Sequence, residues 1–165
     1  MIKLLPDVDT GIDDALALFF LSESQKKGQL DILGCTTVGG NAEVAQTSRN
    51  TLKIWEMAGA EIPVASGAER PLLSSLNTAP LVHGDDGLGN TFLSPPKESA
   101  SEESAADMIL RISHQHAGEL TLLTTAPLSN LGAALLHDPT LAGRIRNLVC
   151  MGGAVFTGNV SAVAE

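Results

Sequence analysis

The chain has 165 residues, a length typical of one globular domain, and we expect residues 1–165 to form a single domain. Hydrophobic residues make up 44% of the chain and charged residues 18%, a balance that excludes disordered and collagen-like proteins. The formal net charge of −9 predicts weak attraction to phosphate backbones and to anionic membranes. Because only 3% of the residues are aromatic, surfaces for stacking single-stranded bases are scarce, and we expect neither nucleic acid nor membrane as a partner.

Apolar runs and cysteines bear on where the protein resides in the cell. The longest unbroken apolar run, residues 15–21, is far shorter than the roughly 20 residues that a membrane span requires. We recognise no secretory signal at the start, and the 2 cysteines without a CxxC spacing fit a reducing compartment. We therefore expect a cytoplasmic protein.

The first part of the chain alternates between apolar runs and helical patterns. The apolar run at residues 2–5 predicts a strand, and the run at residues 15–21 predicts a helix that is closed by Gly28. This helix is apolar on nearly every face, so we expect it to lie buried against a sheet. A second strand is predicted at residues 30–38, an amphipathic helix at 42–58 and a third strand at 62–65.

Periodicity is lost between residues 66 and 104, and a loop of this length inside a domain is usually functional or mobile. The pattern then resumes with a helix at 104–116, a strand at 120–124, a helix at 127–136 and a strand at 148–151. Strands that alternate with helices form parallel βαβ units. The sequence therefore predicts the α/β class, with an open, mainly parallel, Rossmann-like sheet and helices on both of its faces.

Ligands of such sheets bind beyond the carboxyl ends of the strands, and an acidic segment follows the first strand there. Asp7, Asp9, Asp13 and Asp14 place four carboxylates within eight residues. Two like charges 4 Å apart repel by about 1 kcal/mol in water and by several times more near a protein surface. A helix N-terminus offers only about half a positive charge, so a hard cation such as Ca²⁺ or Mg²⁺ is the simplest compensation. The alternative is that Asp7 and Asp9 are turn residues and Asp13 is a helix cap, all of them solvated.

Spacing tests two kinds of metal site. A calcium-binding EF-hand that begins at Asp7 would need Gly and Glu where the chain has Ile12 and Leu18, so this interpretation fails. The D-x-D-x-T motif of haloacid-dehalogenase-type phosphatases resembles the segment, but Thr10 and Gly11 stand in the reverse order. A Mg²⁺-dependent phosphatase therefore stays the less favoured alternative.

The acidic segment resembles the opening motif D-x-D-P-G-x-D-D-A of the inosine-uridine preferring nucleoside hydrolase family, with Thr10 at the place of its Pro. The resemblance continues in order along the chain through residues 36–41, 49–53, 83–89, 127–131 and 151–154 and ends in 158–165. It implies that the chain is the N-terminal part of a nucleoside hydrolase domain, an apparently truncated one whose remainder would complete the site. A non-catalytic fragment of such an enzyme is the alternative.

The family resemblance implies hydrolysis of the N-glycosidic bond of purine or pyrimidine ribonucleosides around one Ca²⁺. Asp9, Asp14 and the backbone carbonyl of Thr125 would bind Ca²⁺, and Asp9 would be the general base that activates the Ca²⁺-bound water. Asp13 would hold a ribose hydroxyl, and Asp7 would support the loop from behind the ligands. The resemblance also implies a homo-oligomer, a dimer or a tetramer.

Further substrate contacts are implied at positions that have plainer interpretations when each is taken alone. Asn41 could be a helix N-cap, Met151 a packing residue and His83 a surface residue of a glycine-rich loop. Asn159 and Glu165 could be solvated loop residues. By the resemblance, Asn41, Met151, Asn159 and Glu165 contact the sugar. His83 is a further candidate, which would contact the substrate or help to close the site.

Overall fold

Strands and helices alternate along the chain in the structure, a computed structural model that describes residues 1–156 and 158. The first half contains β1 (Ile2–Val8), α1 (Ile12–Lys26), β2 (Leu30–Ile32), β3 (Cys35–Thr37), α2 (Val44–Ala58) and β4 (Val64–Ser66). The second half contains α3 (Pro80–His83), α4 (Ala105–Gln115), β5 (Leu120–Thr124), α5 (Ser129–His137), the 3₁₀ helix η1 (Pro139–Gly143) and β6 (Ile145–Cys150).

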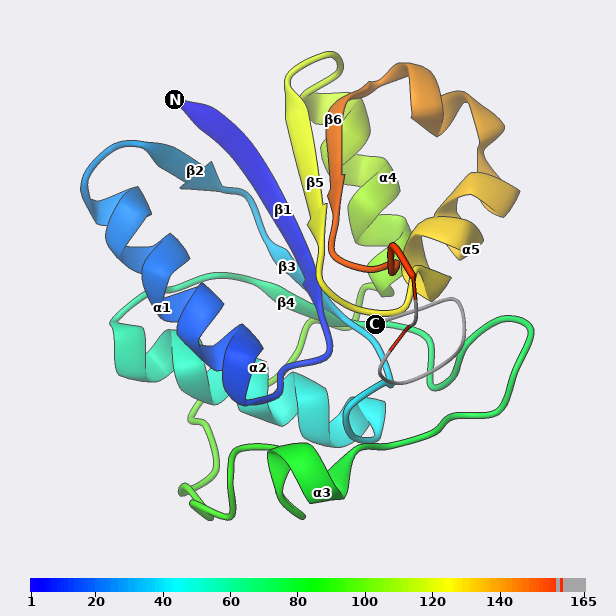
Figure 1. Cartoon of the computed structure of the whole chain (residues 1–165). Helices are drawn as coiled ribbons and strands as arrows, with labels where there is room; N and C mark the ends of the chain where they lie inside the picture. The colour runs from blue at the N-terminus through cyan, green and yellow to red at the C-terminus, as the bar shows by residue number, and fades with distance from the viewer. Residues whose placement is uncertain (157, 159–165) are drawn as a thin grey trace.

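The strands form one parallel sheet in the order β4-β3-β1-β5-β6, and the short β2 pairs with the start of β1 (Figure 1). Asp7 of β1 lies in register with Thr36 of β3 on one side and with Thr124 of β5 on the other. From β1 the chain builds the sheet first toward β4 and then, after α4, toward β6. The strand order therefore reverses between β1 and β5, which is where open α/β sheets bind ligands.

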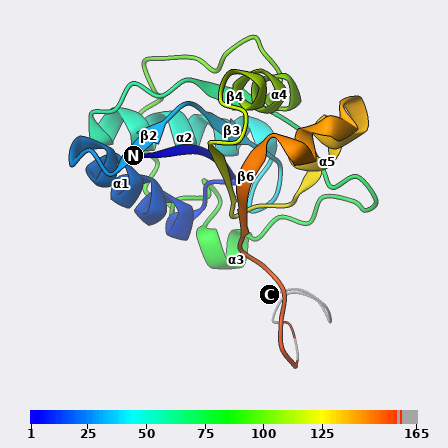
Figure 2. The same cartoon turned by 90° about the horizontal axis from the view of Figure 1, so that it is seen from above.

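Helices cover both faces of the sheet, and the expected α/β class is confirmed. In Figure 2, α1 lies at the left of the view and α5 at the right. One core joins α1 and α2 to the sheet through Leu18, Ile54 and Trp55. The other joins α4 and α5 to the opposite face through Met108 and Leu131. Because helices pack on both faces of the sheet, the strand ends that carry the acidic residues are held in place.

The predicted strand at 30–38 is in fact two strands, β2 and β3, with a break at Leu33 and Gly34. A Cβ added at Gly34 would lie 3.0 Å from the sulfur of Met108 and 3.3 Å from Cδ1 of Ile112. The backbone thus approaches α4 directly at this glycine. Beyond the break the N–H of Cys35 donates to Pro63 O, so β3 pairs with the strand on its other side.

Helix α1 packs against the sheet as expected, but only one of its apolar faces is buried. Ala15, Leu18 and Leu21 are buried, whereas the side chains of Leu16 and Phe20 are 69% and 70% exposed. A helix on the outer layer of a sheet turns only one face inward, whatever the composition of its other face. The apolar composition of this segment therefore did not show which of its residues would be exposed.

The irregular stretch from 66 to 104 contains one short helix, α3, that the sequence pattern did not predict. Ser101 in this stretch forms an isolated β-bridge with Ala65 of β4. Among residues 1–156 and 158, no helix combines the length and the apolar composition needed to cross a membrane.

Candidate active site

Asp7 lies at the end of β1 and is completely buried. Its Oδ1 accepts hydrogen bonds from Thr36 Oγ1 at 2.7 Å and from Asn130 Nδ2 at 2.8 Å, while Oδ2 has no partner. Burial raises the pKa of Asp7 to about 6, against the opposite effect of these two hydrogen bonds. The position and contacts of Asp7 fit a residue that supports the loop rather than one that meets solvent.

Asp9 follows β1 and is also buried. Its Oδ2 accepts a hydrogen bond of 2.7 Å from the backbone N–H of Asn41, and burial raises its pKa to about 6. A Cβ added at Gly40 would lie only 2.0 Å from the same oxygen, so only glycine allows this approach of the loop after β3. The loop after β3 thereby orients the carboxylate of Asp9.

Asp14 lies in the first turn of α1, and its carboxylate turns inward. Thr125, directly after β5, donates to Asp14 Oδ1 at 2.6 Å, and the buried Oδ2 has no hydrogen-bond partner. Burial raises the pKa of Asp14 to about 7 despite the bond from Thr125, and the charges of Asp9 and Asp13 act in the same direction as burial. Asp9 and Asp14 are thus two neighbouring carboxylates that lack enough compensating positive charge.

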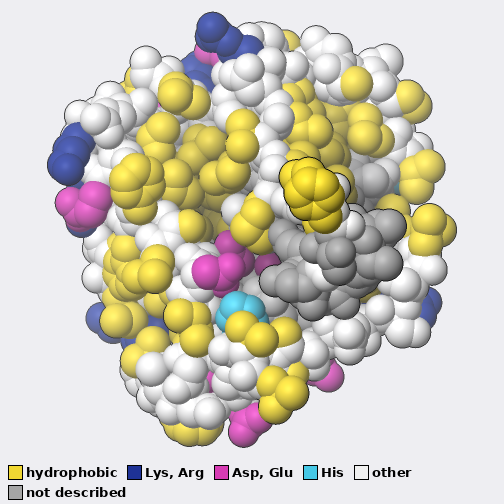
Figure 3. Space-filling model, viewed as in Figure 1, with side chains coloured by type: hydrophobic (Ala, Val, Ile, Leu, Met, Phe, Trp, Pro, Cys, Tyr) yellow, Lys and Arg dark blue, Asp and Glu magenta, His cyan; other side chains and the backbone are white. Residues whose placement is uncertain are grey.

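His83 is buried against the acidic loop, contrary to the surface interpretation of this residue. Its Nδ1 accepts from the backbone N–H of Ile12 at 3.2 Å and lies 3.9 Å from Oδ1 of Asp13. A Cβ at Gly11 would lie 2.5 Å from Nδ1 of His83 and 2.9 Å from Nδ2 of Asn41. Figure 3 shows acidic side chains beside a histidine near the middle of this face.

The four acidic residues separate into three buried carboxylates and one exposed carboxylate. Asp7, Asp9 and Asp14 are buried, so the interpretation of Asp7 and Asp9 as solvated turn residues is wrong. Asp13 does not cap the helix, because the N-cap of α1 is Gly11, and its side chain is 61% exposed. It is therefore accessible to a ligand at this edge of the sheet.

The remaining predicted substrate residues fall in different places. Asn41 lies within the cluster, beside Asp9 and Gly11. Met151 is 45% exposed, and its N–H donates to Thr124 O, which places it beside the end of β5. Asn159 and Glu165 lie outside the described residues.

Sequence reasoning missed the residues that hold the carboxylates in place. Asn130 donates to Asp7 Oδ1 and to Thr37 O, and its own Oδ1 accepts from the N–H of Ala68. It is buried and links segments that are more than a hundred positions apart. An asparagine in the first turn of an otherwise apolar helix was the available signal, although it did not name the partner.

The carboxylates partly fit a calcium ion. Asp14 offers a buried oxygen without a partner, and it neighbours the oxygens of Asp9 and Thr125, which are the ligand type that Ca²⁺ takes. Within residues 1–156 and 158, however, no three His, Cys, Asp or Glu side chains converge as a metal-holding group. The described residues therefore offer a pair of carboxylates, and further ligands would have to be carbonyls, waters or other groups.

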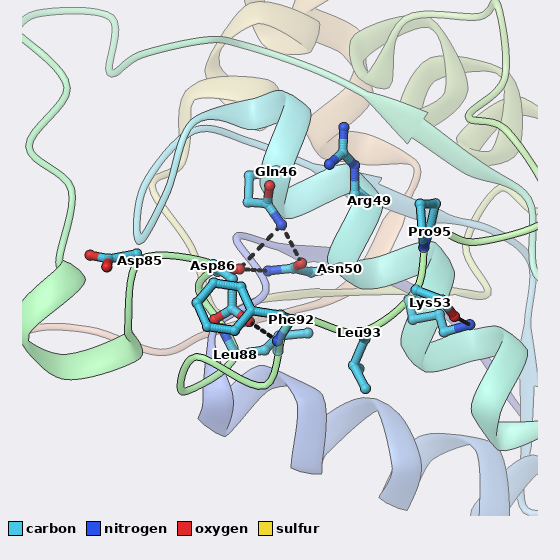
Figure 4. Close-up of a pocket in the computed structure, with 11 residues that line it drawn as sticks. Gln46, Arg49, Asn50, Lys53, Asp85, Asp86, Leu88, Phe92, Leu93 and Pro95 are labelled. Carbon is cyan, nitrogen blue, oxygen red and sulfur yellow. Dashed lines mark hydrogen bonds between the residues drawn. The ribbon is translucent and has the colours of Figure 1, made fainter.

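Two cavities lie away from these carboxylates. One of about 340 Å³ lies between α2 and the loop around Asp86 and Phe92, and its lining is drawn in Figure 4. Another of about 680 Å³ lies beside Trp55 and Lys97. Neither cavity is lined by Asp9 or Asp14. We therefore identify the candidate site by the chemistry of the acidic cluster and not by the size of a cavity.

Known proteins resemble this chain over nearly its whole length. It is 40% identical over 166 residues to uridine nucleosidase 1 of Arabidopsis thaliana, an alignment that covers 99% of this chain and 48% of that protein. It is 33% identical to the inosine-uridine preferring nucleoside hydrolase of Leishmania major, with 99% and 52% covered. The chain thus spans about half the length of the curated relatives it matches.

Solved structures agree with the sequence comparison. A plant nucleoside hydrolase superposes with a TM-score of 0.92 at 37% identity and covers 99% of this chain and 52% of its own. The purine-preferring ribonucleoside hydrolase of Gardnerella vaginalis has a TM-score of 0.90 at 32% identity, with 97% and 52% covered. The model of the inosine-uridine preferring nucleoside hydrolase family matches residues 4–165. With the acidic cluster at the switch point of the sheet, this match shows that the chain belongs to the inosine-uridine preferring nucleoside hydrolase family.

Proposed function

We propose that this protein hydrolyses the N-glycosidic bond of ribonucleosides to give ribose and a free base, with Asp9 as the general base. The observation that carries the proposal is the group of buried carboxylates Asp7, Asp9 and Asp14 at the switch point of the sheet. Burial of several carboxylates is costly, and such sites are usually maintained for binding or catalysis. The family membership supplies the class of reaction.

The chemistry needs a group that removes a proton from the attacking water and groups that stabilise an oxocarbenium-like sugar. Asp9 suits the first task because its carboxylate is buried at the switch point of the sheet and the N–H of Asn41 fixes its orientation. Asp13 is exposed and suits a ribose hydroxyl. Carboxylates around the sugar would also stabilise the positive charge that develops on it.

Calcium is part of the proposal. Asp9, Asp14 and the backbone carbonyl of Thr125 would hold the ion, and the unpartnered Oδ2 of Asp14 supports this choice. When bound, Ca²⁺ would supply the positive charge that these carboxylates lack and would lower the pKa of a water molecule. Asp7 would keep the loop in place through Thr36 and Asn130.

Relatives suggest the substrates to test first. Those named above carry the words uridine, inosine-uridine and purine-preferring in their names, so we propose uridine and inosine as substrates. A cytoplasmic homodimer or homotetramer belongs to the same proposal, which sedimentation of the purified protein would test.

The direct test is release of ribose from uridine and inosine by the purified protein and by the variant Asp9→Asn. The variant keeps the shape of the side chain but removes the base, so we expect turnover to fall by about 100- to 10,000-fold. Asp31→Asn, the same change on β2, is the matched control and keeps full activity. Full activity in Asp9→Asn, or no ribose from either nucleoside with a folded wild type, would contradict the proposal.

A further inference from the structure

Asn50 of α2 connects two loops that are far apart in sequence. Its side chain is buried, and its Nδ2 donates to the backbone oxygen of Thr10 at 3.2 Å and to that of Asp86 at 3.0 Å. Thr10 belongs to the acidic loop, and Asp86 belongs to the loop that follows α3. The contact with Asp86 is drawn in Figure 4, where Asn50 and Gln46 both point toward Asp86.

Both the donor group and the acceptor atom of the Asn50 side chain have a hydrogen-bond partner of the right kind. Carbonyl oxygens only accept hydrogen bonds, so the NH₂ group must face Thr10 and Asp86. Its Oδ1 accepts from Gln46 Nε2 at 2.8 Å, and Gln46 also donates to the oxygen of Asp86 at 3.2 Å. A carboxylate of the same shape would place an oxygen against two oxygens.

Gly87 makes the close packing of this contact possible. It has a positive φ of 75°, and an added Cβ would lie 2.8 Å from Nδ2 of Asn50 and 3.7 Å from the oxygen of Thr10. Both its conformation and the space around it therefore require glycine. The loop after α3, the acidic loop and α2 meet at this glycine.

Both segments held by Asn50 carry residues of the candidate active site. Thr10 stands between Asp9 and Gly11 in the acidic loop, and Asp86 lies three positions after His83. The oxygen of His83 accepts from the N–H of Gly89, and its ring accepts from the N–H of Ile12. Displacement of either loop would therefore change the position of His83 relative to Asp9 and Asp13.

We propose that Asn50 is a positioning residue, which holds the loop after α3 against the acidic loop so that His83 and the carboxylates keep their relative positions. The proposal rests on the proposed function for its kinetic consequence, but its structural consequence can be measured without substrate. Asn50 itself does not contact the substrate in this account.

The test compares Asn50→Asp with wild type in nucleoside hydrolysis and in hydrogen exchange. Misplaced binding groups weaken substrate binding, so we expect KM to rise about 10-fold or more. A purely structural defect would instead lower apparent kcat at unchanged KM, because it reduces only the amount of folded enzyme. Gln115→Glu, the same amide-to-carboxylate change at an exposed position of α4, is the matched control and leaves KM unchanged.

Hydrogen exchange tests the contact independently of activity. In Asn50→Asp we expect faster exchange at the amide of Ile12 and across residues 84–92, while the core amides of β1 and β5 stay protected. Unchanged exchange and unchanged KM would overturn the proposal. A uniform loss of protection with unchanged KM would overturn it as well, because it indicates a general structural role.

Gly87→Ala disturbs the same contact from the loop after α3. It replaces Asn50→Asp in the test if that variant does not fold. The added methyl group would displace the Asn50 amide, and we expect the same rise in KM and the same faster exchange. Gly118→Ala is its control, because Gly118 also has a φ of 75° but nothing within 4 Å of an added Cβ. Identical behaviour of the two alanine variants would contradict the proposal. If wild type hydrolyses no nucleoside, the proposed function fails, and the exchange measurement still decides the role of Asn50.

Discussion

The side chains of Asp13 and Asp14 are neighbours in sequence and have opposite environments. Helix α1 begins at Ile12, so Asp14 falls on the same face as Leu18, four residues later, and both are buried. Asp13 falls on the outer face. The sequence predicted a group of four carboxylates after a strand, but the division into three buried and one exposed depends on where the helix begins.

The side chain of Thr10 restrains the acidic loop. It stands where the related motif has a proline, and its Oγ1 lies 2.6 Å from Thr51 Oγ1 in a buried pair. Because Thr51 donates its own proton to Thr47 O at 2.8 Å, the hydroxyl of Thr10 donates to Thr51. A side-chain contact with α2 thus restrains the loop where a proline would restrain the backbone.

This contact gives a prediction for stability. Thr51→Val keeps the shape of the side chain but leaves the buried hydroxyl of Thr10 without an acceptor, so we expect the free energy of unfolding to fall by about 1–3 kcal/mol. The double variant Thr10→Val with Thr51→Val removes both polar groups, and it should cost less than the sum of the two single changes. Urea unfolding of the four proteins measures this, and additive costs would contradict it.

At the scale of the elements, the alternation of strands and helices was predictable, and the deviations have local causes. The break between β2 and β3 comes from the close approach of α4 at Gly34, which no local pattern encodes. The short α3 has only four residues, too few for a periodic pattern. The exposure of Leu16 and Phe20 on α1 depends on the layer in which the helix lies.

Gly34 gives a prediction at this scale. Gly34→Ala would place a methyl group 3.0 Å from the sulfur of Met108 and 3.3 Å from Cδ1 of Ile112, so these side chains must move, at a cost of about 1–3 kcal/mol in the free energy of unfolding. Gly143→Ala is the control, since an added Cβ there has nothing within 4 Å. Thermal unfolding of both variants is the measurement, and equal stabilities would show that the break between β2 and β3 has another cause.

At the scale of the whole molecule, parallel βαβ units imply that the carboxyl ends of the strands share one edge, so the sequence could locate the candidate site. It could not give the order of the strands. The contacts that follow from that order, such as Asn130 with Asp7 across the sheet and Asn50 with Thr10 and Asp86, depend on the assembled fold. Three of the carboxylates that contribute to the net charge of −9 are buried together at one edge of the sheet, so part of that charge belongs to the candidate site.

The calcium dependence of ribose release tests the account most directly. We expect ribose release from uridine to fall at least about 100-fold after calcium is removed with a chelator and to recover when calcium is restored. Asp14→Asn should need about 10- to 100-fold more calcium for half-maximal recovery, because it removes a charged ligand. Undiminished ribose release by protein shown to be free of metal would contradict the proposal that Asp9 and Asp14 form a calcium-dependent nucleoside hydrolase site.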